Sequence, residues 1–527
     1  MYDYVIVGAG SAGCVLAARL SEDPDVRVAL IEVGPPDNAD EIHIPAAYGK
    51  LYQSGFDWAY FSEPEPQLDG HRTYIPRGRV LGGSSSINAM VYIRGNRADY
   101  DEWKALGCDG WGYEDLLPYF IRAEDNERGA SEYHGAGGPL SVSDGRSRHP
   151  LMAAWIEAAQ EAGMPANDDF NGPSQDGVGF YQLTQRDGMR CSAAVAYLNP
   201  AMERPNLDVV TGALATGIVW DGDRAAGVEV DEVGLRRELP AEREVILSGG
   251  SYNSPQLLML SGIGPAEDLE LLGLEVRADL PVGHNLQDHP NCGIVMLTDH
   301  ETLISAETDE NIALLEDEGR GPLTSNVAEA GGFMRTREEL DAPDIQFHAA
   351  PVMFHDEGLG APMDDGYAWG ACLLRPTSRG AVTLRSTLPS ARPRILHNYY
   401  DTEDDRAAMI AGLRRSLEIG AQPALRRHQR EPFTCPASDS DEDLLAHMRA
   451  YTQTLYHPVG TCAMGSVVDD DLRVKGCRGL RVVDASVMPT LVRGNTNAPT
   501  IAVAERAADL IRGRAPAPAR TQAATAV

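Results

Sequence analysis

His457 is a candidate general base in this chain of 527 residues. It stands between an aromatic residue and a proline, after a predicted helix and before a glycine turn, so its ring could be held ready to take a proton. Asn495 lies just before a predicted C-terminal helix, where its amide could point at a ligand. Each residue also has a structural interpretation. A lone histidine often only packs, and the asparagines before the helix, Asn495 and Asn497, could serve the helix start, with Asn497 as its N-cap.

Other residue types that could do chemistry are few. His348 ends a predicted strand and could face a pocket, whereas His289, after Asp288, is more typical of a packing or hydrogen-bonded turn residue. The sequence has no Gly-x-Ser-x-Gly nucleophile elbow and no P-loop. None of the eight cysteines forms a C-x-x-C pair or a zinc-like spacing with histidine. We therefore expect no metal site and reduced, mostly buried cysteines.

A glycine-rich turn near the N-terminus is typical of dinucleotide binding. Apolar residues 4–7 predict a buried strand, and Gly8, Gly10 and Gly13 follow in the pattern G-x-G-x-x-G. The first glycine allows the tight turn, the second lets a pyrophosphate approach the backbone, and the third lets a helix pack on the strand. That helix, predicted for residues 12–20, would direct free N–H groups at the phosphates.

Glu32 ends a second apolar strand, predicted for residues 28–32. Its carboxylate would accept hydrogen bonds from the ribose hydroxyls of an adenosine, and it would repel a 2′-phosphate, which disfavours NADP. This unit alone separates neither NAD from FAD nor a redox cofactor from a structural one.

Residues 77–92 contain a second glycine-rich turn. Gly82 and Gly83 are followed by three serines, so backbone N–H groups could approach a polar ligand closely. The small and apolar residues that come next would suit one face of a flat ring. A surface turn that leads into a strand accounts for the same residues equally well.

The composition is that of an ordinary globular protein with a strongly acidic balance, a formal net charge of −33. The arginines form no basic patch larger than the short pairs at 236–237, 414–415 and 426–427, so we expect no binding to nucleic acid or to anionic membranes. No stretch approaches the roughly 18 apolar residues of a membrane span. The first strand begins by residue 4, which leaves no room for a leader peptide, and we therefore expect a cytoplasmic location.

The secondary-structure pattern divides the chain into α/β ends and a different middle region, from about residue 291 to 455. A second strand–glycine–helix junction is predicted at residues 244–260, with Pro255 in the first helical turn. The C-terminal part returns to a strand, 480–484, and a helix, 501–511. Further strands are predicted at 207–210, 226–230, 344–348, 381–384 and 394–396, and further helices at 151–162, 404–419 and 441–451.

Five ordered segments make the chain resemble the glucose–methanol–choline (GMC) flavoprotein oxidoreductases nearly from end to end. The matching segments are residues 8–13 with Glu32, 77–95 (RGRVLGGSSSINAMVYIRG), 250–265 (GSYNSPQLLMLSGIGP), 456–461 (YHPVGT) and 484–500 (DASVMPTLVRGNTNAPT).

The resemblance implies an α/β FAD-binding Rossmann-like domain and an α+β substrate domain with a mostly antiparallel sheet. The implied boundaries are 1–145, 186–290 and 455–512 for the FAD-binding domain, 146–185 and 291–454 for the substrate domain, and 513–527 for a disordered tail.

It also implies functional residues. His457 would be the catalytic base and Asn495 its partner, with His348, Asn291 and Tyr456 in the substrate pocket. The residues expected to contact FAD are Gly8, Gly10, Ser11, Ala12, Gly13, Glu32, Trp58, Val80, Gly82, Gly83, Asn88, Ala89, Met90, Val91, Ala215, Tyr456, Asp484, Ala485 and Thr496.

The implied reaction is oxidation of a primary alcohol to an aldehyde. His457 would take the hydroxyl proton, the alkoxide would pass hydride to flavin N5, and Asn495 would orient the oxygen. The acceptor would be O₂ or a quinone. A cyanohydrin-cleaving lyase with a structural FAD remains the alternative, and either a monomer or a homodimer fits the sequence.

Two positions depart from choline-oxidising members of the family. Ile87 stands where some of them tether FAD through a histidine, so we expect non-covalent FAD. Asn291 stands where they carry a glutamate that faces a quaternary amine, so neutral primary alcohols rank above choline. Tyr456, Phe347 and Trp369 could still form an aromatic box for a cation.

Overall fold

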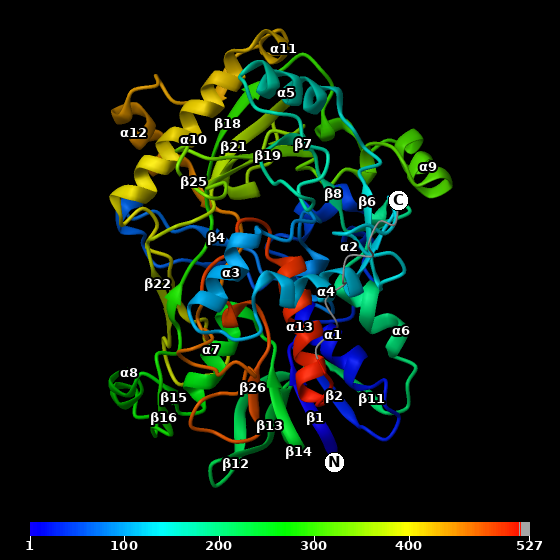
Figure 1. The fold of residues 1–527 in the computed structure, drawn as a ribbon, viewed down its shortest axis with the longest axis vertical. Helices are drawn as coiled ribbons and strands as arrows, with labels where there is room; N and C mark the ends of the chain where they lie inside the picture. Colours follow the sequence, from blue (N-terminus) through cyan, green and yellow to red (C-terminus); the bar gives the residue numbers. More distant parts are fainter. Residues whose placement is uncertain (516, 518–527) are drawn as a thin grey trace, which may run out of the picture.

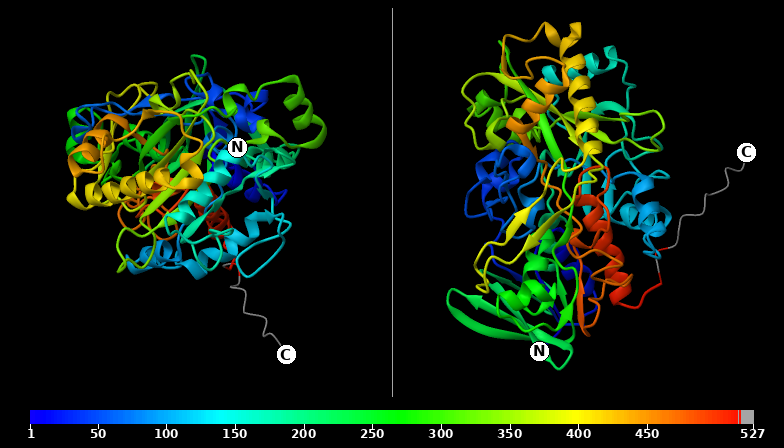
Figure 2. Two further views of the ribbon diagram at one scale, coloured as in Figure 1. Left: turned by 90° about the horizontal axis from the view of Figure 1, so that it is seen from above. Right: turned by 90° about the vertical axis from the view of Figure 1, so that its left-hand side faces the viewer.

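The computed structural model describes residues 1–515 and 517, so most of the predicted tail at 513–527 lies outside the described residues. Two seven-stranded sheets dominate the molecule, one in its lower half and one in its upper half as drawn in Figure 1. We call them the lower sheet and the upper sheet. Figure 2 shows the same two parts from above and from the side.

The lower sheet has the strand order β11-β2-β1-β14-β13-β12, with β26 beside β14. Its β11, β2, β1, β14 and β26 run parallel, and β12–β13–β14 form an antiparallel meander. The strands are β1 (Tyr2–Val7), β2 (Val28–Glu32), β11 (Leu207–Thr211), β12 (Leu214–Asp221), β13 (Arg224–Glu232), β14 (Leu235–Leu247) and β26 (Leu480–Val482).

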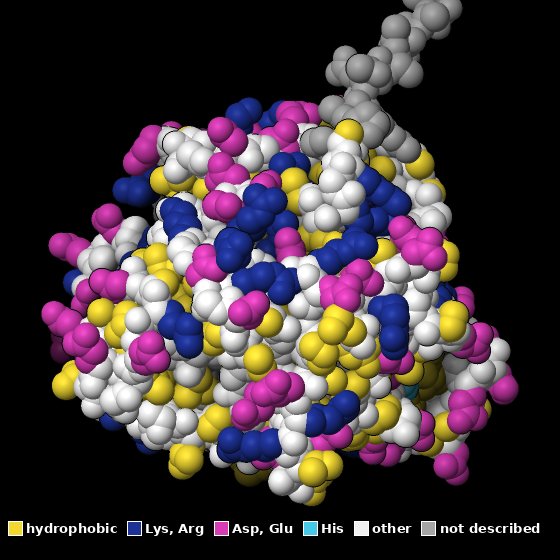
Figure 3. All heavy atoms as spheres, turned by 90° about the horizontal axis from the view of Figure 1, so that it is seen from below, with side chains coloured by type: hydrophobic (Ala, Val, Ile, Leu, Met, Phe, Trp, Pro, Cys, Tyr) yellow, Lys and Arg dark blue, Asp and Glu magenta, His cyan; other side chains and the backbone are white. Residues whose placement is uncertain are grey.

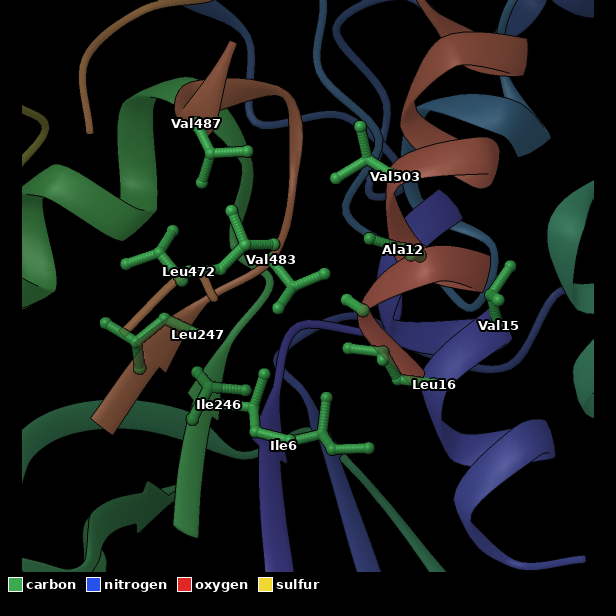
Figure 4. Packing of buried hydrophobic residues seen from close by; sticks show 14 of the residues in the cluster. Ile6, Ala12, Val15, Leu16, Ile246, Leu247, Leu472, Val483, Val487 and Val503 are labelled. Carbon is green, nitrogen blue, oxygen red and sulfur yellow. The ribbon is translucent and has the colours of Figure 1, made fainter. Parts of the chain in front are cut away.

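Apolar packing holds this sheet against helices from both ends of the chain. The helices α1 (Ser11–Leu20) and α13 (Asn497–Ile511) lie side by side, and both are buried over most of their length. Figure 4 shows Ile6 of β1 and Ile246 of β14 directed toward the same core as Leu16 of α1. A strand buried on both faces needs a continuous apolar run, and residues 4–7 supply it.

The upper sheet has the order β24-β18-β21-β20-β19-β7, with β25 beside β18, and every pair in it is antiparallel. One face packs on α10 (Glu403–Ala421) and α5 (Pro150–Glu161). The strands are β7 (Gly177–Phe180), β18 (Pro290–Leu297), β19 (Ala330–Met334), β20 (Ile345–Ala350), β21 (Gly366–Leu373), β24 (Pro432–Thr434) and β25 (Thr452–Thr454).

Shorter elements connect and cover the two sheets. The other helices are α2 (Asp40–His43), α3 (Arg97–Ala105), α4 (Tyr113–Ala123), α6 (Asn199–Ala201), α7 (Gly250–Leu260), α8 (Ala266–Leu271), α9 (Asp309–Glu318), α11 (Pro423–Arg426) and α12 (Asp441–Tyr451). The other strands are β3 (Tyr60–Phe61), β4 (Tyr74–Ile75), β5 (Glu124–Asn126), β6 (Leu140–Asp144), β8 (Gln182–Leu183), β9 (Gln185–Arg186), β10 (Met189–Arg190), β15 (Ile263–Gly264), β16 (Ala278–Asp279), β17 (His284–Leu286), β22 (Gly380–Thr383) and β23 (Arg394–Leu396).

The predicted fold class is confirmed, while several element boundaries differ. Helix α7 begins at Gly250, so Pro255 lies inside it and not in its first turn. Helix α13 begins at Asn497, four residues before the predicted start, and its N-cap is Thr496. The predicted strand at 244–247 is only the end of the long β14. Pattern-based boundaries failed here because glycines and polar residues occupy helix starts that face a ligand site.

The described residues also show how charges, cysteines and apolar helices are distributed in the fold. Acidic and basic side chains are interspersed on the face drawn in Figure 3. All eight cysteines are free. Among the described residues, no helix is long and apolar enough to cross a membrane, and no group of side chains could hold a metal ion.

Candidate active site

A cavity of about 660 Å³ runs between the two sheets and is lined by both. Glu32 of the lower sheet lines it, as do His348 on β20 and His457 just after β25. The volume lies within the range of small-molecule and cofactor sites. Residues more than four hundred positions apart in the sequence therefore share one site.

Three helix N-termini line this cavity: Ser11 of α1, Gly250 of α7 and Asn497 of α13. The N–H groups in the first turn of a helix have no partner within the helix and carry a partial positive charge, which is the environment that phosphates prefer, although the Gly250 N–H of α7 already donates to Asp484. The Ser11 hydroxyl donates a hydrogen bond to Asn497 Oδ1 (2.7 Å), which joins two of these helix starts.

The glycines in the first turn have different tasks. A Cβ on Gly13 would lie 1.9 Å from the Gly8 carbonyl oxygen, so this glycine serves helix–strand packing. A Cβ on Gly83 would lie 2.6 Å from the Gly10 Cα, which shows how closely the two glycine-rich turns approach each other. A Cβ on Gly10 would meet nothing closer than 4.0 Å, because this position faces the open cavity. The cradle therefore fits a pyrophosphate held against bare backbone.

Glu32 ends β2 at the rim of this cradle. Its Oε2 accepts a hydrogen bond from the Ala9 N–H (3.0 Å), and its Oε1 accepts one from the Gly34 N–H (2.9 Å). Each oxygen keeps a lone pair for a ribose hydroxyl. Burial raises the pKa of Glu32 to about 7, although these N–H groups and Arg79 oppose the shift.

Asp484 fixes the turn after β26. Its Oδ2 accepts hydrogen bonds from the Ser254 hydroxyl (2.6 Å) and the Gly250 N–H (2.9 Å), and its Oδ1 accepts one from the Ser486 N–H (2.8 Å). The carboxylate thus ties the start of α7 to the C-terminal segment on the wall of the cavity.

Two bulky residues of the cavity wall have left-handed backbone angles. Met90 has φ 58° and Tyr456 has φ 70°, and both line the cavity. Such angles are costly for side chains of this size and concentrate at functional sites. The strain at Tyr456 sets the direction of the next residue, His457.

The hydrogen bonds around His457 determine which of its nitrogens carries the proton. His289 Nε2 lies 3.1 Å from the Leu374 carbonyl oxygen, which can only accept, so this nitrogen must carry a hydrogen. Burial lowers the pKa of His289 to about 4, so the ring is neutral and its Nδ1 is a bare acceptor. His457 Nδ1 lies 2.9 Å from that atom and must therefore donate to it.

His457 Nε2 is then the free nitrogen. Burial, followed by the neighbouring His289, His348 and Arg77, lowers the pKa of His457 well below its usual value, which keeps the ring neutral. The Asn495 amide donates to Nε2 from 3.2 Å, and Gln346 in turn donates to Asn495 Oδ1 (3.3 Å). His457 Nε2 is therefore an unprotonated base that lies next to an amide donor.

A buried carboxylate anchors this arrangement from behind. Asp288 Oδ1 accepts a hydrogen bond from the His457 backbone N–H (2.7 Å), and Asp288 Oδ2 accepts one from the Tyr399 hydroxyl (2.6 Å). Arg77 Nη1 donates to the Tyr456 carbonyl (2.8 Å). The backbone at 456–457 is thus held at both residues.

Most of the predicted site residues come together in this cavity. Three of the predicted residues lie outside the lining: Val80 is fully buried, Gly13 packs against β1, and Gly82 has φ 86° and so little room that a Cβ there would lie 2.2 Å from the Ser86 hydroxyl oxygen. The predicted residues that line the cavity are Gly8, Gly10, Ser11, Ala12, Glu32, Trp58, Gly83, Asn88, Ala89, Met90, Val91, Ala215, Asn291, His348, Tyr456, His457, Asp484, Ala485, Asn495 and Thr496.

The predicted aromatic box is wrong. Phe347 packs against Trp155 of α5, and the Trp369 indole N–H donates to the Ser416 carbonyl of α10 (3.0 Å). Both side chains lie on the helix-covered face of the upper sheet, because neighbours in a strand point to opposite faces. Their neighbours His348 and Gly370 line the cavity, and Trp369 also contributes to its lining, whereas Phe347 does not.

The sequence interpretation undervalued His289, which was expected to be a packing or hydrogen-bonded turn residue, and missed Asp288, Gln346 and Arg77. His289 contacts His457 across 168 positions, a pairing that nothing local in the chain indicates. Chemistry offers one signal: if His457 is a base with one unprotonated nitrogen, its other nitrogen carries a hydrogen and needs an acceptor nearby.

Comparison with known proteins finds matches over nearly the whole chain. The family model GMC oxidoreductase matches residues 2–291 with its N-terminal part and residues 376–504 with its C-terminal part. An alcohol dehydrogenase [acceptor] of Pseudomonas putida is 44% identical over 97% of this chain and 96% of its own. The mitochondrial choline dehydrogenase of Homo sapiens is 45% identical over 97% and 90%. The crystal structure of pyridoxine 4-oxidase from Mesorbium loti superposes with a TM-score of 0.90 at 33% identity, over 98% of this chain and 100% of that one.

Proposed function

Because this chain belongs to the GMC oxidoreductase family, whose members use FAD and act on CH–OH donors, we propose that it oxidises a primary alcohol to an aldehyde with His457 as the base. The observation that carries the proposal is the ordered hydrogen-bond chain Leu374–His289–His457–Asn495, which keeps His457 Nε2 unprotonated, as an acceptor that meets the Asn495 amide and can take a proton in its place.

The residues divide the work in a simple way. The reacting hydroxyl approaches His457 Nε2 and gives it the proton as the carbinol C–H bond breaks. Asn495 donates its amide hydrogen bond to the same oxygen and stays neutral at any pH, so it positions the substrate without competing for the proton. FAD, when bound, supplies the hydride acceptor.

The cofactor half of the cavity supports non-covalent FAD. The helix N-termini at Ser11, Gly250 and Asn497 would hold the pyrophosphate, and Glu32 the adenosine ribose. Ile87 lines the cavity as a buried aliphatic side chain, which has no nucleophile for a covalent link. Denaturation in acid should therefore release all of the yellow cofactor from the protein.

The electron acceptor is O₂ or a quinone in this proposal, and a cytoplasmic location and a monomeric or homodimeric state stay predictions. The rival function is a cyanohydrin-cleaving lyase with a structural FAD. A lyase would not need hydride transfer, so the two functions differ in whether substrate changes the redox state of the flavin.

Anaerobic spectroscopy of the purified holoenzyme tests the proposal. A primary alcohol should bleach the flavin absorbance near 450 nm without O₂, and addition of the acceptor, O₂ or a quinone, should restore it. Peroxide formed in stoichiometric amounts identifies O₂ as the acceptor, whereas its absence together with turnover of a quinone identifies the quinone. An unchanged flavin spectrum with every alcohol in a broad panel would contradict the proposed function.

A further inference from the structure

Two polar side chains on the cavity face of the upper sheet lack partners. Asn291 on β18 and His348 on β20 both line the cavity. Asn291 Oδ1 and His348 Nε2 are buried, and neither makes a hydrogen bond with the described residues. A buried polar atom left in this state costs about 1–3 kcal/mol, so nearly all such atoms in native proteins find a partner. Because both side chains line the cavity, a bound ligand can supply the missing partner.

The strand register explains why these side chains are accessible. β21 lies between β18 and β20, and Gly370 pairs with Gly293 on one side and with His348 on the other. The two glycines leave bare backbone next to His348. A Cβ at Gly293 would meet nothing closer than 3.5 Å, so the space above it belongs to the cavity. Asn291 precedes Gly293 by two residues and points to the same face.

We call the part of the cavity between Asn291 and His348, above the bare backbone of Gly293 and Gly370, the slot. It begins beside His457 and Asn495. Cys372 of β21 pairs with both Asn291 and Gln346, and Gln346 donates to Asn495. His348 lies two residues further along the strand, a step of about 7 Å. Beyond it the same face presents Val295, Ala350 and Ala368, which are apolar. The polar part of the slot is therefore short and lies next to the reacting centre.

The chemistry of the slot selects an uncharged group that both donates and accepts. Burial lowers the pKa of His348 to about 3, so its ring is neutral and has one N–H and one bare nitrogen. Asn291 offers an N–H and a carbonyl oxygen in the same way. The carboxylates that line the cavity, among the described residues, are Glu32 and Asp484 in the cofactor half and Asp356 and Glu357 on another loop. A cation in the slot would be desolvated without a counter-charge.

We infer that the substrate is an alcohol with a second, uncharged hydroxyl, which Asn291 and His348 bind while the reacting hydroxyl meets His457. This inference rests on the proposed alcohol oxidation. A hydroxyl is the smallest group that can donate to one of these side chains and accept from the other.

The test compares α,ω-diols with the mono-alcohols of the same length, from three to eight carbons, by anaerobic stopped-flow reduction of the holoenzyme. We expect the ratio of the reduction rate constant to the dissociation constant to favour the diol about 2- to 12-fold at the best length, the effect of one neutral hydrogen bond. Asn291→Leu should abolish the preference, so that the diol and the mono-alcohol of the same length give equal ratios in this variant. Asn291→Thr, which retains a hydroxyl, should restore part of the preference.

Each outcome has a separate meaning. If no alcohol reduces the flavin, alcohol oxidation itself is wrong. If mono-alcohols and diols reduce it equally well at every length, the second-hydroxyl site is wrong while alcohol oxidation stands. If the diol preference persists unchanged in Asn291→Leu, Asn291 does not form that site, which also overturns the inference. FAD content and melting temperature check that both variants fold.

Discussion

Replacement of His289 separates the proton-ordering role of this residue from a packing role. In His289→Leu, the His457 Nδ1–H loses the acceptor that now lies 2.9 Å away. The ring must then leave this N–H unpaired or move the hydrogen to Nε2, where it would oppose the Asn495 amide donor at 3.2 Å. Either response costs about 1–3 kcal/mol, which corresponds to a roughly 5- to 150-fold loss of the reactive tautomer.

The assay is the rate constant of flavin reduction by a saturating alcohol without O₂. We expect His289→Leu to lower it about 5- to 150-fold with full FAD content and little change in the substrate dissociation constant. His289→Gln should retain most of the activity, because its Oε1 can accept from His457 while its amide donates to the Leu374 carbonyl. A purely structural role would not distinguish these two variants by hydrogen-bonding pattern.

His149 offers a matched control. Its Nε2 meets the Glu301 carbonyl (3.0 Å) and its Nδ1 accepts from the Leu151 N–H (3.2 Å), the same pair of roles at the start of α5. His149→Leu should therefore leave flavin reduction within about twofold of the wild type. Wild-type rates in His289→Leu, or an equal loss in His289→Gln and His289→Leu, would refute the tautomer argument.

The remaining predictions concern stability and the cofactor cradle. The pKa of His348 is lowered to about 3 in the folded state, against about 6.5 in the unfolded state, so the folded protein is stabilised fully above pH 6.5 and loses about 2 kcal/mol of stability by pH 5. The melting temperature should therefore drop less from pH 7 to pH 5 in His348→Leu than in the wild type. An equal drop would contradict this assignment. Glu32→Gln removes the acceptor of either Ala9 or Gly34, so FAD affinity in a fluorescence titration should fall about 10- to 100-fold; unchanged affinity would exclude Glu32 from the cofactor site. Gly10→Ala should fold normally but bind FAD at least tenfold more weakly, because its Cβ enters the open cavity. Gly83→Ala should instead lower the melting temperature, because its Cβ would lie 2.6 Å from the Gly10 Cα. The reverse pattern would show that the cradle is wrongly assigned.

The parts of the site that depend on local sequence were predictable. The glycine turn at residues 8–13 and the strand that ends at Glu32 each carry their own signal, a buried apolar run followed by residues that only a tight turn requires. The resemblance then supplied His457 and Asn495. The glycine turn and the strand lie where they were predicted because short-range backbone geometry decides them, while the catalytic roles of His457 and Asn495 stay predictions.

The parts that depend on pairing between distant segments were not predictable in this way. Helix α7 starts early at Gly250 because Asp484, 234 positions away, caps its first N–H group. The partner of His457 is set by the packing of β25 on β18, which brings residue 289 beside residue 457. The aromatic box, in contrast, could have been rejected from the sequence alone. If His348 faces the cavity, strand alternation turns Phe347 to the other face.

The central claim is that His457 accepts the alcohol proton, and the most direct test is the rate constant of anaerobic flavin reduction in His457→Ala. A general base contributes roughly 10²- to 10⁴-fold, so we expect a loss of that size with FAD still bound in full. The wild-type rate should stay constant from pH 9 down to below pH 6.5, because the lowered pKa of His457 keeps the base neutral there. Reduction of His457→Ala at close to the wild-type rate would contradict the account.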